Sequence, residues 1–457
     1  MAVVPLLAGA VLLAGWAAVR RAPDPRVGRS TATRYAAAAT VGVATAMVAE
    51  RLAPGRADAG VALFAPGAGR WMPFVTCLAG VAATALAPVT PAPTAGPAGP
   101  AGPAGSVPGL APVTSTPMAA DPRGTFARIL LVLACGTAAT SFGGPGAALA
   151  SWALAAFVVW RELLDQADRS LARVFGRHHL LGVGACALGL LLPGGAGVTA
   201  GLLVALGVGV RQCLLPLHLW HEPLARGAPP GILVAFAAGP AGLLLLPEMT
   251  RTLPGRGWEN LLVAAAAATA MLGAGLGLVA RDVRTALARV GLALSGIVSC
   301  GLLAGSALAA AGAVLAWQVG AVATAGMTMI AAATEARRGR MELAGQGGCF
   351  ARTPRLAVAF LLFGLTAVGY PATVGFVWED LLLDGVGSWF LPLGGALALA
   401  VAGSGATVVK WYFAGYTGRR DHVGEHDLTT REFRAATGLL AALVLAQFHP
   451  AFLLARP

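Results

Sequence analysis

Residues 211–230 of the chain read RQCLLPLHLWHEPLARGAPP and close a long apolar run that begins near Gly197. Arg211 and Pro216 interrupt this run, where an ordinary membrane-spanning helix would stay apolar. A charge at membrane depth costs about 2.5–3.5 kcal/mol on insertion scales, so it usually faces the interior of a helix bundle or a polar path. Proline removes a backbone donor and clashes with the preceding turn. We therefore predict that the helix kinks or breaks within a turn of Arg211.

This stretch leaves two interpretations open. Broken helices with polar groups near the middle of the membrane recur in transport proteins, which would make the stretch a functional site. Alternatively, Arg211 extends to a membrane interface, and His218 and Trp220 mark the edge of the membrane.

The composition is typical of a polytopic helical membrane protein. The chain has 457 residues, of which 57% are hydrophobic and 11% are charged, and its mean hydropathy is +0.74. Soluble domains carry about 25% charged residues. The net charge of +12 would suit a nucleic-acid partner, but the basic residues cluster in short loops between apolar segments, which indicates membrane topology instead. The six cysteines show no metal-ligand spacing and are interpreted as small core residues.

Apolar runs of about 17–25 residues predict fourteen membrane spans. Their approximate limits are 3–19, 33–49, 71–88, 126–142, 146–162, 179–193, 197–219, 229–247, 259–280, 287–304, 306–333, 355–378, 388–413 and 434–454. A stretch at 89–122 is rich in Pro, Ala and Gly and is interpreted as a flexible aqueous linker. The predicted organisation is an N-terminal three-helix segment at 1–88, this linker, and a membrane domain at 123–454.

The basic residues also predict the orientation of the chain. Connections on one side of the membrane, beginning with residues 20–34, hold 25 Lys and Arg residues, and the opposite connections hold six. Lys and Arg accumulate in short cytoplasmic loops. We therefore expect a multi-pass protein of the cell inner (plasma) membrane, with both termini outside.

A second interrupted helix is predicted in the twelfth span. Gly364, Pro371 and Gly375 precede the acidic pair Glu379 and Asp380. A break is again followed by an ionisable group, so spans seven and twelve match in kind, and such pairs indicate internal repeats with a site at each break. The alternative is that Glu379 and Asp380 begin an external loop.

Two further charged positions allow both a functional and a structural interpretation. Glu162, at the end of span five, is either a buried carboxylate whose pKa is shifted by desolvation or by a nearby Arg, or a surface acid beside Asp165 and Asp168; the sequence alone slightly favours the surface acid. Arg284 falls in a charged helix start between spans nine and ten, which is usually a solvated turn.

The positions of the histidines and the absence of known catalytic motifs both argue against an enzymatic site in this chain. Only His218 and His221 lie near a candidate site, whereas His178 and His179 are interpreted as loop residues. The sequence shows no nucleophile elbow, phosphate loop, haem pair or iron–sulfur spacing. We predict no catalytic centre, no metal site and no cofactor in this chain.

The interrupted segments resemble one protein family. Arg211–Pro230 resembles the Lys-x(4)-Pro-Phe-His-x-Trp-x-Pro-Asp segment, ending in Gly-Ala-Pro, of the antiporter-like M- and N-type membrane subunits of respiratory complex I and of Mrp cation/proton antiporters. Asp282–Ala288 resembles their Asp-Leu-Lys-Arg-Leu-Leu-Ala segment, and Gly296 falls where a later glycine is expected. Tyr370–Glu379 resembles their twelfth-helix Pro-Pro-Thr-Ala-Gly-Phe element, and Asp427–Glu432 resembles their closing segment. Order and spacing agree over roughly residues 126–454.

The resemblance implies a fold and a role. The fold has fourteen helices, two inverted five-helix repeats, and broken helices seven and twelve. The role is that of a proton-translocating subunit in a lipid bilayer, beside other membrane subunits of a larger complex, with no nucleic acid and with no quinone bound by this chain alone. Such a subunit is at most the translocating part of an NADH:quinone oxidoreductase-type enzyme. In such subunits a glutamate on the fifth helix, lysines on the seventh and eighth, and a lysine or glutamate on the twelfth form a proton path. For this chain we predict a path of Glu162, Arg211, His218, Arg284 and Glu379.

The sequence also departs from the family pattern. Arg211 stands in place of the seventh-helix lysine, residues 238–241 lack the ionisable group expected on the eighth helix, and Gln318 and Thr324 stand where histidine and lysine are usual. Arginine stays protonated in proteins, with a pKa above about 12, so it is a poor proton relay. Three alternatives therefore stay open: a non-conducting scaffold subunit, the membrane half of a two-component inorganic-carbon uptake system, and, less well supported, a solitary secondary transporter.

Overall fold

The computed structural model describes residues 3–52, 71–88, 122–142, 144–166, 168–192, 197–253, 255–343, 345, 347–419 and 425–448. Within these residues the chain forms helices α1 (Val3–Arg20), α2 (Pro25–Leu52), α3 (Met72–Ala85), α4 (Pro122–Phe142), α5 (Gly144–Asp165), α6 (Arg169–Leu191), α7 (Gly197–Arg211), α8 (His221–Gly227), α9 (Pro230–Ala237), α10 (Ala241–Thr252), α11 (Arg256–Leu278), α12 (Val283–Leu303), α13 (Ala307–Arg338), α14 (Pro354–Ala367), α15 (Val374–Gly387), α16 (Leu391–Tyr416) and α17 (Thr430–Phe448). The predicted linker, up to Asp121, lies outside the described residues.

The helices confirm the predicted class of an all-helical polytopic membrane protein. Nine helical segments of the described chain are long and apolar enough to cross a membrane, and α3, α7 and α14 are shorter apolar helices. Segment α9–α10 qualifies only when Pro230–Arg251 is counted as one unit. The number fourteen stays a prediction.

Several helices begin before their apolar runs, at acidic residues whose carboxylates accept backbone N–H groups of the first turn. The Asp168 carboxylate accepts the backbone N–H of Leu171 at 2.9 Å, and the Asp282 carboxylate accepts that of Thr285 at 2.9 Å. These bonds satisfy free N–H groups of the first turn. Helix α6 therefore begins ten residues before the predicted limit of span six, and the interpretation of His178 and His179 as loop residues is wrong.

Glycines bring neighbouring helices into backbone contact. A Cβ added at Gly273 on α11 would lie 2.5 Å from the amide nitrogen of Ala293 and 2.8 Å from the carbonyl oxygen of Arg289, both on α12. Small residues at such crossings allow the close packing on which helix association in lipid depends.

Three helices are interrupted inside the bundle. Helix α7 ends at Arg211 and α8 begins only at His221, which confirms the predicted break. Helices α14 and α15 are separated by residues 368–373, which confirms the second one. The interruption between α9 and α10 was not predicted; it precedes Pro240, whose ring cannot occupy a helix interior without strain.

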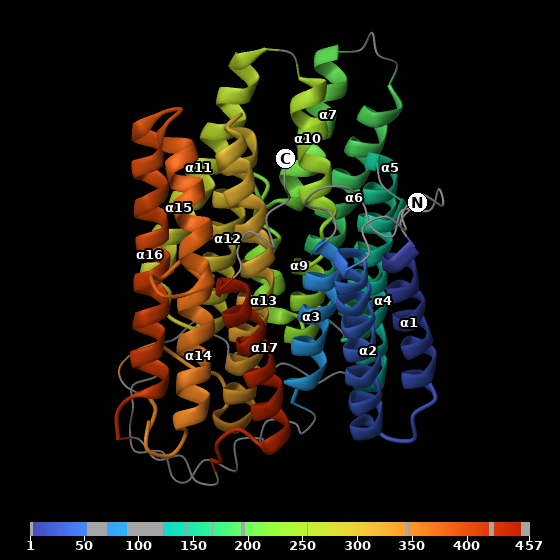
Figure 1. Cartoon of the computed structure of the whole chain (residues 1–457), viewed down its shortest axis with the longest axis vertical. Coiled ribbons are helices and arrows are strands. Elements are labelled where there is room, and N and C mark those ends of the chain that lie inside the picture. The colour runs from blue at the N-terminus through green and yellow to red at the C-terminus, as the bar shows by residue number, and fades with distance from the viewer. Residues whose placement is uncertain are drawn as a thin grey trace.

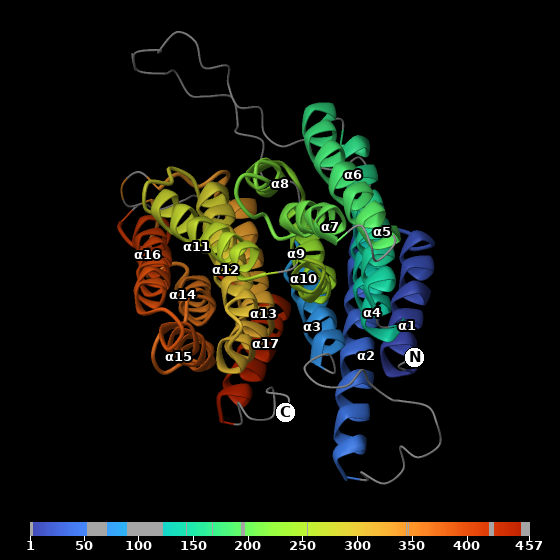
Figure 2. The same ribbon diagram turned by 90° about the horizontal axis from the view of Figure 1, so that it is seen from above.

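The helices form two groups around a central row. Seen from above, α1, α2, α4, α5 and α6 lie on one side and α11, α14, α15 and α16 on the other, with α3, α9, α10 and α13 between them (Figure 2). Figure 1 shows α7 in the upper part of the molecule and α14 in the lower part, below α15. The two interrupted helices therefore enter the bundle from opposite ends, as expected for an inverted repeat.

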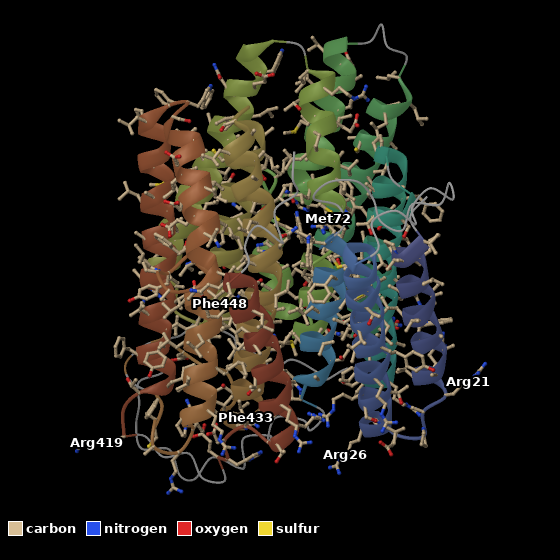
Figure 3. The ribbon with its side chains drawn as sticks, viewed as in Figure 1. Arg21, Arg26, Met72, Arg419, Phe433 and Phe448 are labelled. Atoms are coloured by element: carbon tan, nitrogen blue, oxygen red, sulfur yellow. The ribbon has the colours of Figure 1, made fainter. Side chains whose placement is uncertain are left out.

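The basic loops gather at one end of the bundle. Figure 3 shows Arg21, Arg26 and Arg419 at the lower end, although they come from opposite ends of the sequence. All three belong to the set of connections that holds the excess of positive charge. This arrangement agrees with the alternation of loops that the charge count predicts.

Candidate functional site

Arg211 is buried at the α7 break, with 8% of its surface exposed. Its Nη2 donates hydrogen bonds to the carbonyl oxygens of Phe236 at 2.9 Å and Gly239 at 3.0 Å, and its guanidinium carbon lies 4.6 Å from the centroid of the Phe236 ring. The Phe236 carbonyl also accepts the backbone N–H of Gly239 at 3.2 Å. Both carbonyls stand at the C-terminal end of α9, where the helix dipole is negative. The interpretation of Arg211 as an arginine that extends to the interface is therefore wrong.

Side chains from α11 and α12, together with Trp220 at the end of the segment itself, support the irregular segment after Arg211. The hydroxyl of Thr269 accepts the N–H of Leu215 at 3.0 Å, and the Ser295 hydroxyl donates to the carbonyl of Gln212 at 2.6 Å. The indole of Trp220 donates to the carbonyl of Val210 at 3.0 Å. Backbone that leaves a helix inside a membrane protein needs such partners, so the broken geometry is built into the bundle.

A cavity of about 150 Å³ lies beside Arg211. Its walls come from the α7–α8 segment, α9, α12 and α13. The polar side chains on these walls are Arg211, Gln212, Cys213, His221, Ser295, Thr324 and Thr328, with the indoles of Trp220 and Trp317. Thr324, which stands where the related proteins usually have lysine, therefore faces the same space as Arg211.

Glu162 is fully buried on α5 and carries a complete set of partners. Its carboxylate accepts hydrogen bonds from the Thr125 hydroxyl at 2.5 Å, from Arg128 Nη1 at 2.5 Å and from the Gln166 amide at 2.9 Å. Arg128 also pairs with Asp165. The interpretation of Glu162 as a surface acid is wrong, and its cationic partner is Arg128.

This pair was not predicted from the sequence. Helix α4 begins at Pro122, four residues before the predicted span. In a helix that starts there, Thr125 and Arg128 are three residues apart and share one face. A proline at the first helical position is a common start signal, and it would have revealed the pair.

His179 lies at the centre of a buried aromatic cluster. The Trp152 indole donates to His179 Nδ1 at 3.0 Å, and the centroid of the His179 ring lies 4.2 Å from that of Phe175, 4.4 Å from that of Trp220 and 5.2 Å from that of Phe236. Phe236 also packs on the Arg211 guanidinium. The cluster therefore joins α5 and α6 to the α7 break. Leu171, Phe175, His179, Gly182 and Cys186 recur at helical spacing along the buried face of α6, which is the signal that sequence reasoning overlooked.

Two predicted site residues lie apart from the cavity. His218 is half-buried in the irregular segment, and its Nδ1 has no hydrogen-bond partner within the described chain. Arg284 pairs with Glu335 at 2.9 Å and donates to the carbonyl of Arg226 at 3.0 Å. Arg284 thus connects the end of α8 and the start of α12 to the end of α13, and neither His218 nor Arg284 contributes to the cavity wall.

Glu379 lies on α15, directly against the second interruption. A Cβ added at Gly369, whose φ is +79°, would lie 2.8 Å from Oε2 of Glu379. Asp380 is exposed, whereas Glu379 is partly covered. Helix α15 continues to Gly387, so the alternative in which these acids begin an external loop is wrong.

Gln318 is a buried polar residue between the two interruptions. It is 2% exposed, and neither its amide oxygen nor its amide nitrogen has a hydrogen-bond partner in the described structure. Its neighbour Trp317 lines the cavity. Contacts of Gly312 with Leu382 and of Gly385 with Ala309 show that α13 and α15 run antiparallel, which places Gln318 toward the level of Val377 and Trp378. Buried polar atoms of this kind usually bind water.

The sequence matches a known family over the interrupted region. Residues 193–407 match the family described as "NADH:quinone oxidoreductase/Mrp antiporter, TM". Subunit 13 of the NADH-quinone oxidoreductase of Thermus thermophilus is 28% identical over 257 residues, which are 54% of this chain and 54% of the relative. Subunit N of the NADH-quinone oxidoreductase of Desulfovibrio desulfuricans is 28% identical over 276 residues, 55% of this chain and 52% of the relative. The matches thus span about half the length of these curated relatives.

Solved structures share the fold over nearly the whole chain. A chain of respiratory complex I from Thermus thermophilus superposes with a TM-score of 0.77 at 19% identity, covering 98% of this chain and 96% of that one. A chain of the Mrp complex from Dietzia sp. superposes with a TM-score of 0.69 at 15% identity, covering 99% and 94%. With the matched residues, this likeness leads to one conclusion. Residues 193–407, just under half of the chain, are similar to the NADH:quinone oxidoreductase/Mrp antiporter transmembrane family, and the chain shares the fold of these solved structures.

Proposed function

We propose that this chain is a proton-translocating, antiporter-like subunit of a larger membrane complex. In this proposal it spans the cell inner membrane with both termini outside and works beside other membrane subunits. Residues 1–88 form an N-terminal three-helix segment, 89–122 a linker, and 123–454 the conducting domain. The matched residues 193–407 hold both interruptions that the proposal uses. The relatives are named as NADH-quinone oxidoreductase subunits, and the similar folds come from multi-subunit complexes.

The contact between Glu379 and Gly369 carries the proposal. It places a carboxyl group against the opened backbone of a broken helix. A carboxyl group changes its charge when it takes up or gives up a proton, and a broken helix inside a bundle is where transport proteins place such groups. Glu379 is therefore the residue proposed to exchange protons, with Glu162 as a second one at the other side of the bundle.

Arg211 has a different part in the proposal. Because its guanidinium stays charged, it influences protons and ions nearby through its field without carrying a proton itself. His218 lies in the bend of the same path. Arg284 keeps α12 in place through Glu335.

One observation favours a second candidate function, that of a non-conducting scaffold subunit. Glu162 is held by Arg128, Thr125 and Gln166 together, and Arg211 is held by two carbonyls. A scaffold would keep these contacts to stabilise the fold while it binds partner subunits. In one form of this second function, the partner is the soluble component of an inorganic-carbon uptake system.

The test compares two neighbouring acids. The complex copurified with this chain is reconstituted in vesicles, and proton flux is measured for Glu379→Gln and for Asp380→Asn, an exposed control on the same turn. The proposal expects loss of flux in E379Q and near-normal flux in D380N. Unchanged flux in a fully assembled E379Q complex favours the scaffold. Copurified quinone-oxidoreductase subunits support the first function, and a single soluble partner supports the carbon-uptake form of the second.

A further inference from the structure

We propose that the cavity beside Arg211 binds a small monovalent anion, of the size of chloride or bicarbonate, in direct contact with the Arg211 guanidinium. This site does not depend on proton translocation by the chain. It follows from the charge, the burial and the hydrogen bonding of one side chain and from the space next to it.

The guanidinium of Arg211 lacks a carboxylate partner. Other partly buried arginines of the bundle pair with acids, as Arg128 does with Glu162 and Arg284 with Glu335. Within the described residues Arg211 forms no ion pair, and no Asp or Glu of that part of the chain lines its cavity. A buried charge without a counter-charge strongly destabilises the structure around it. A negative group from outside the chain would remove this penalty.

The hydrogen bonds of Arg211 leave donors free. Guanidinium has five N–H donors, and the bonds that Arg211 makes in the described structure come from Nη2. Its Nε is buried without a partner. The carbonyls at the end of α9 contribute at most about half an elementary charge, as the C-terminus of a helix does. The remaining positive charge suits one monovalent anion better than a divalent one.

The cavity has room for that anion. Its volume of about 150 Å³ exceeds the roughly 30 Å³ that one water occupies in the liquid, so a small anion fits together with water. The hydroxyls of Ser295 and Thr324 donate to backbone carbonyls, and Arg211 is the one Arg or Lys among the lining residues. The other walls are mostly apolar, among them Leu233, Val234 and Val298. Such surroundings strengthen the attraction between guanidinium and anion.

Thermal unfolding of the purified full-length chain tests the site. The melting temperature is measured in sodium chloride, sodium bicarbonate and sodium gluconate at equal pH and ionic strength, because gluconate is a much larger monovalent anion than the other two. We expect a saturable rise with chloride or bicarbonate and none with gluconate, and the relative half-saturation concentrations identify the preferred anion. Arg211→Gln should abolish the rise. Arg226→Gln, which removes an equal charge from an exposed position on α8, should retain it.

Two further measurements apply if the R211Q chain does not fold. Ala321→Leu fills the cavity wall and keeps Arg211, so it should reduce the anion response. In crystals of the wild-type chain containing bromide, an anomalous peak should lie in contact with the guanidinium. An equal rise in gluconate, a full response in R211Q, or a cavity that holds only water would overturn the proposal.

Discussion

Arg128 on α4 and Glu162 on α5 form an ion pair at 2.5 Å inside the helix bundle, with 25% of the Arg128 side chain and 1% of the Glu162 side chain exposed. The pair joins two neighbouring helices at the end where the basic loops gather. Because the carboxylate also accepts bonds from Thr125 and Gln166, its charge is well compensated. A buried carboxylate with this many partners holds its position as long as its cation is present.

Loss of the cation should therefore destabilise the chain. Arg128→Ala leaves the Glu162 carboxylate buried without an opposite charge, and we expect a loss of about 3 kcal/mol, as is typical when one partner of a buried pair is removed. Thermal unfolding in detergent measures this loss. Arg161→Ala is the control, because Arg161 is half-exposed and lies 3.8 Å from Asp165; exposed pairs contribute about 0–1 kcal/mol. Equal losses in the two variants would contradict the structural role of the pair.

The hydrogen bond between Trp152 and His179 leads to a second prediction. His179→Phe keeps an aromatic ring in the cluster but leaves the Trp152 indole N–H buried without an acceptor. We expect a loss of about 1–3 kcal/mol, the usual cost of an unsatisfied buried donor, measured as a lower unfolding temperature. The double variant Trp152→Phe with His179→Phe removes both polar atoms and should recover part of the stability. A double variant less stable than H179F would show that the rings, and not this bond, determine the effect.

The sequence predicted the interruptions of the fold better than the limits of its helices. Charged or acidic residues next to Pro and Gly identified the breaks after Arg211 and before Glu379, because each of these residues alone opposes a continuous apolar helix. Helix α6 was predicted ten residues too short. Hydropathy identifies only the part of a helix that lies in lipid. Helix α6 extends beyond that part because Asp168 caps its N-terminus.

The partners of the site residues could not be read from the sequence. Glu162 pairs with Arg128, 34 positions away, and Arg211 bonds to the carbonyls of Phe236 and Gly239, where α9 ends at Ala237. Backbone acceptors carry no sequence signal of their own. The choice between a carboxylate and a carbonyl as the partner of Arg211 depends on how the helices pack.

A third prediction concerns the crossing of α11 and α12. Gly273→Ala would place a methyl group against the Ala293 amide and the Arg289 carbonyl, both of which are backbone atoms that cannot rotate away. We expect the two helices to separate, at a cost of about 1–3 kcal/mol, as for other overpacked contacts. Gly275→Ala on the same helix meets no atom within 4 Å and should be neutral or slightly stabilising. If the unfolding temperatures of both variants fell by the same amount, this account of the crossing would be wrong.

Asp168 supplies the prediction for pH, because it lies in the connection between α5 and α6. Partial burial raises the pKa of the Asp168 carboxyl. Hydrogen bonds from the N–H groups of Leu171 and Ser170 and from the Ser170 hydroxyl lower it by more than burial raises it, so the pKa lies below its ordinary value of 3.8. A group whose pKa is lowered by folding stabilises the folded state above the ordinary pKa and loses that contribution as the pH falls through the lowered one. Asp168→Ala should therefore cost about 1 kcal/mol near neutral pH, as loss of an N-cap does. Asp168→Asn keeps a capping oxygen that does not titrate. The stability of the D168N chain relative to the wild type should rise as the pH falls below 3.8. If the difference in stability between the D168N chain and the wild type did not change with pH, the charged cap would be excluded.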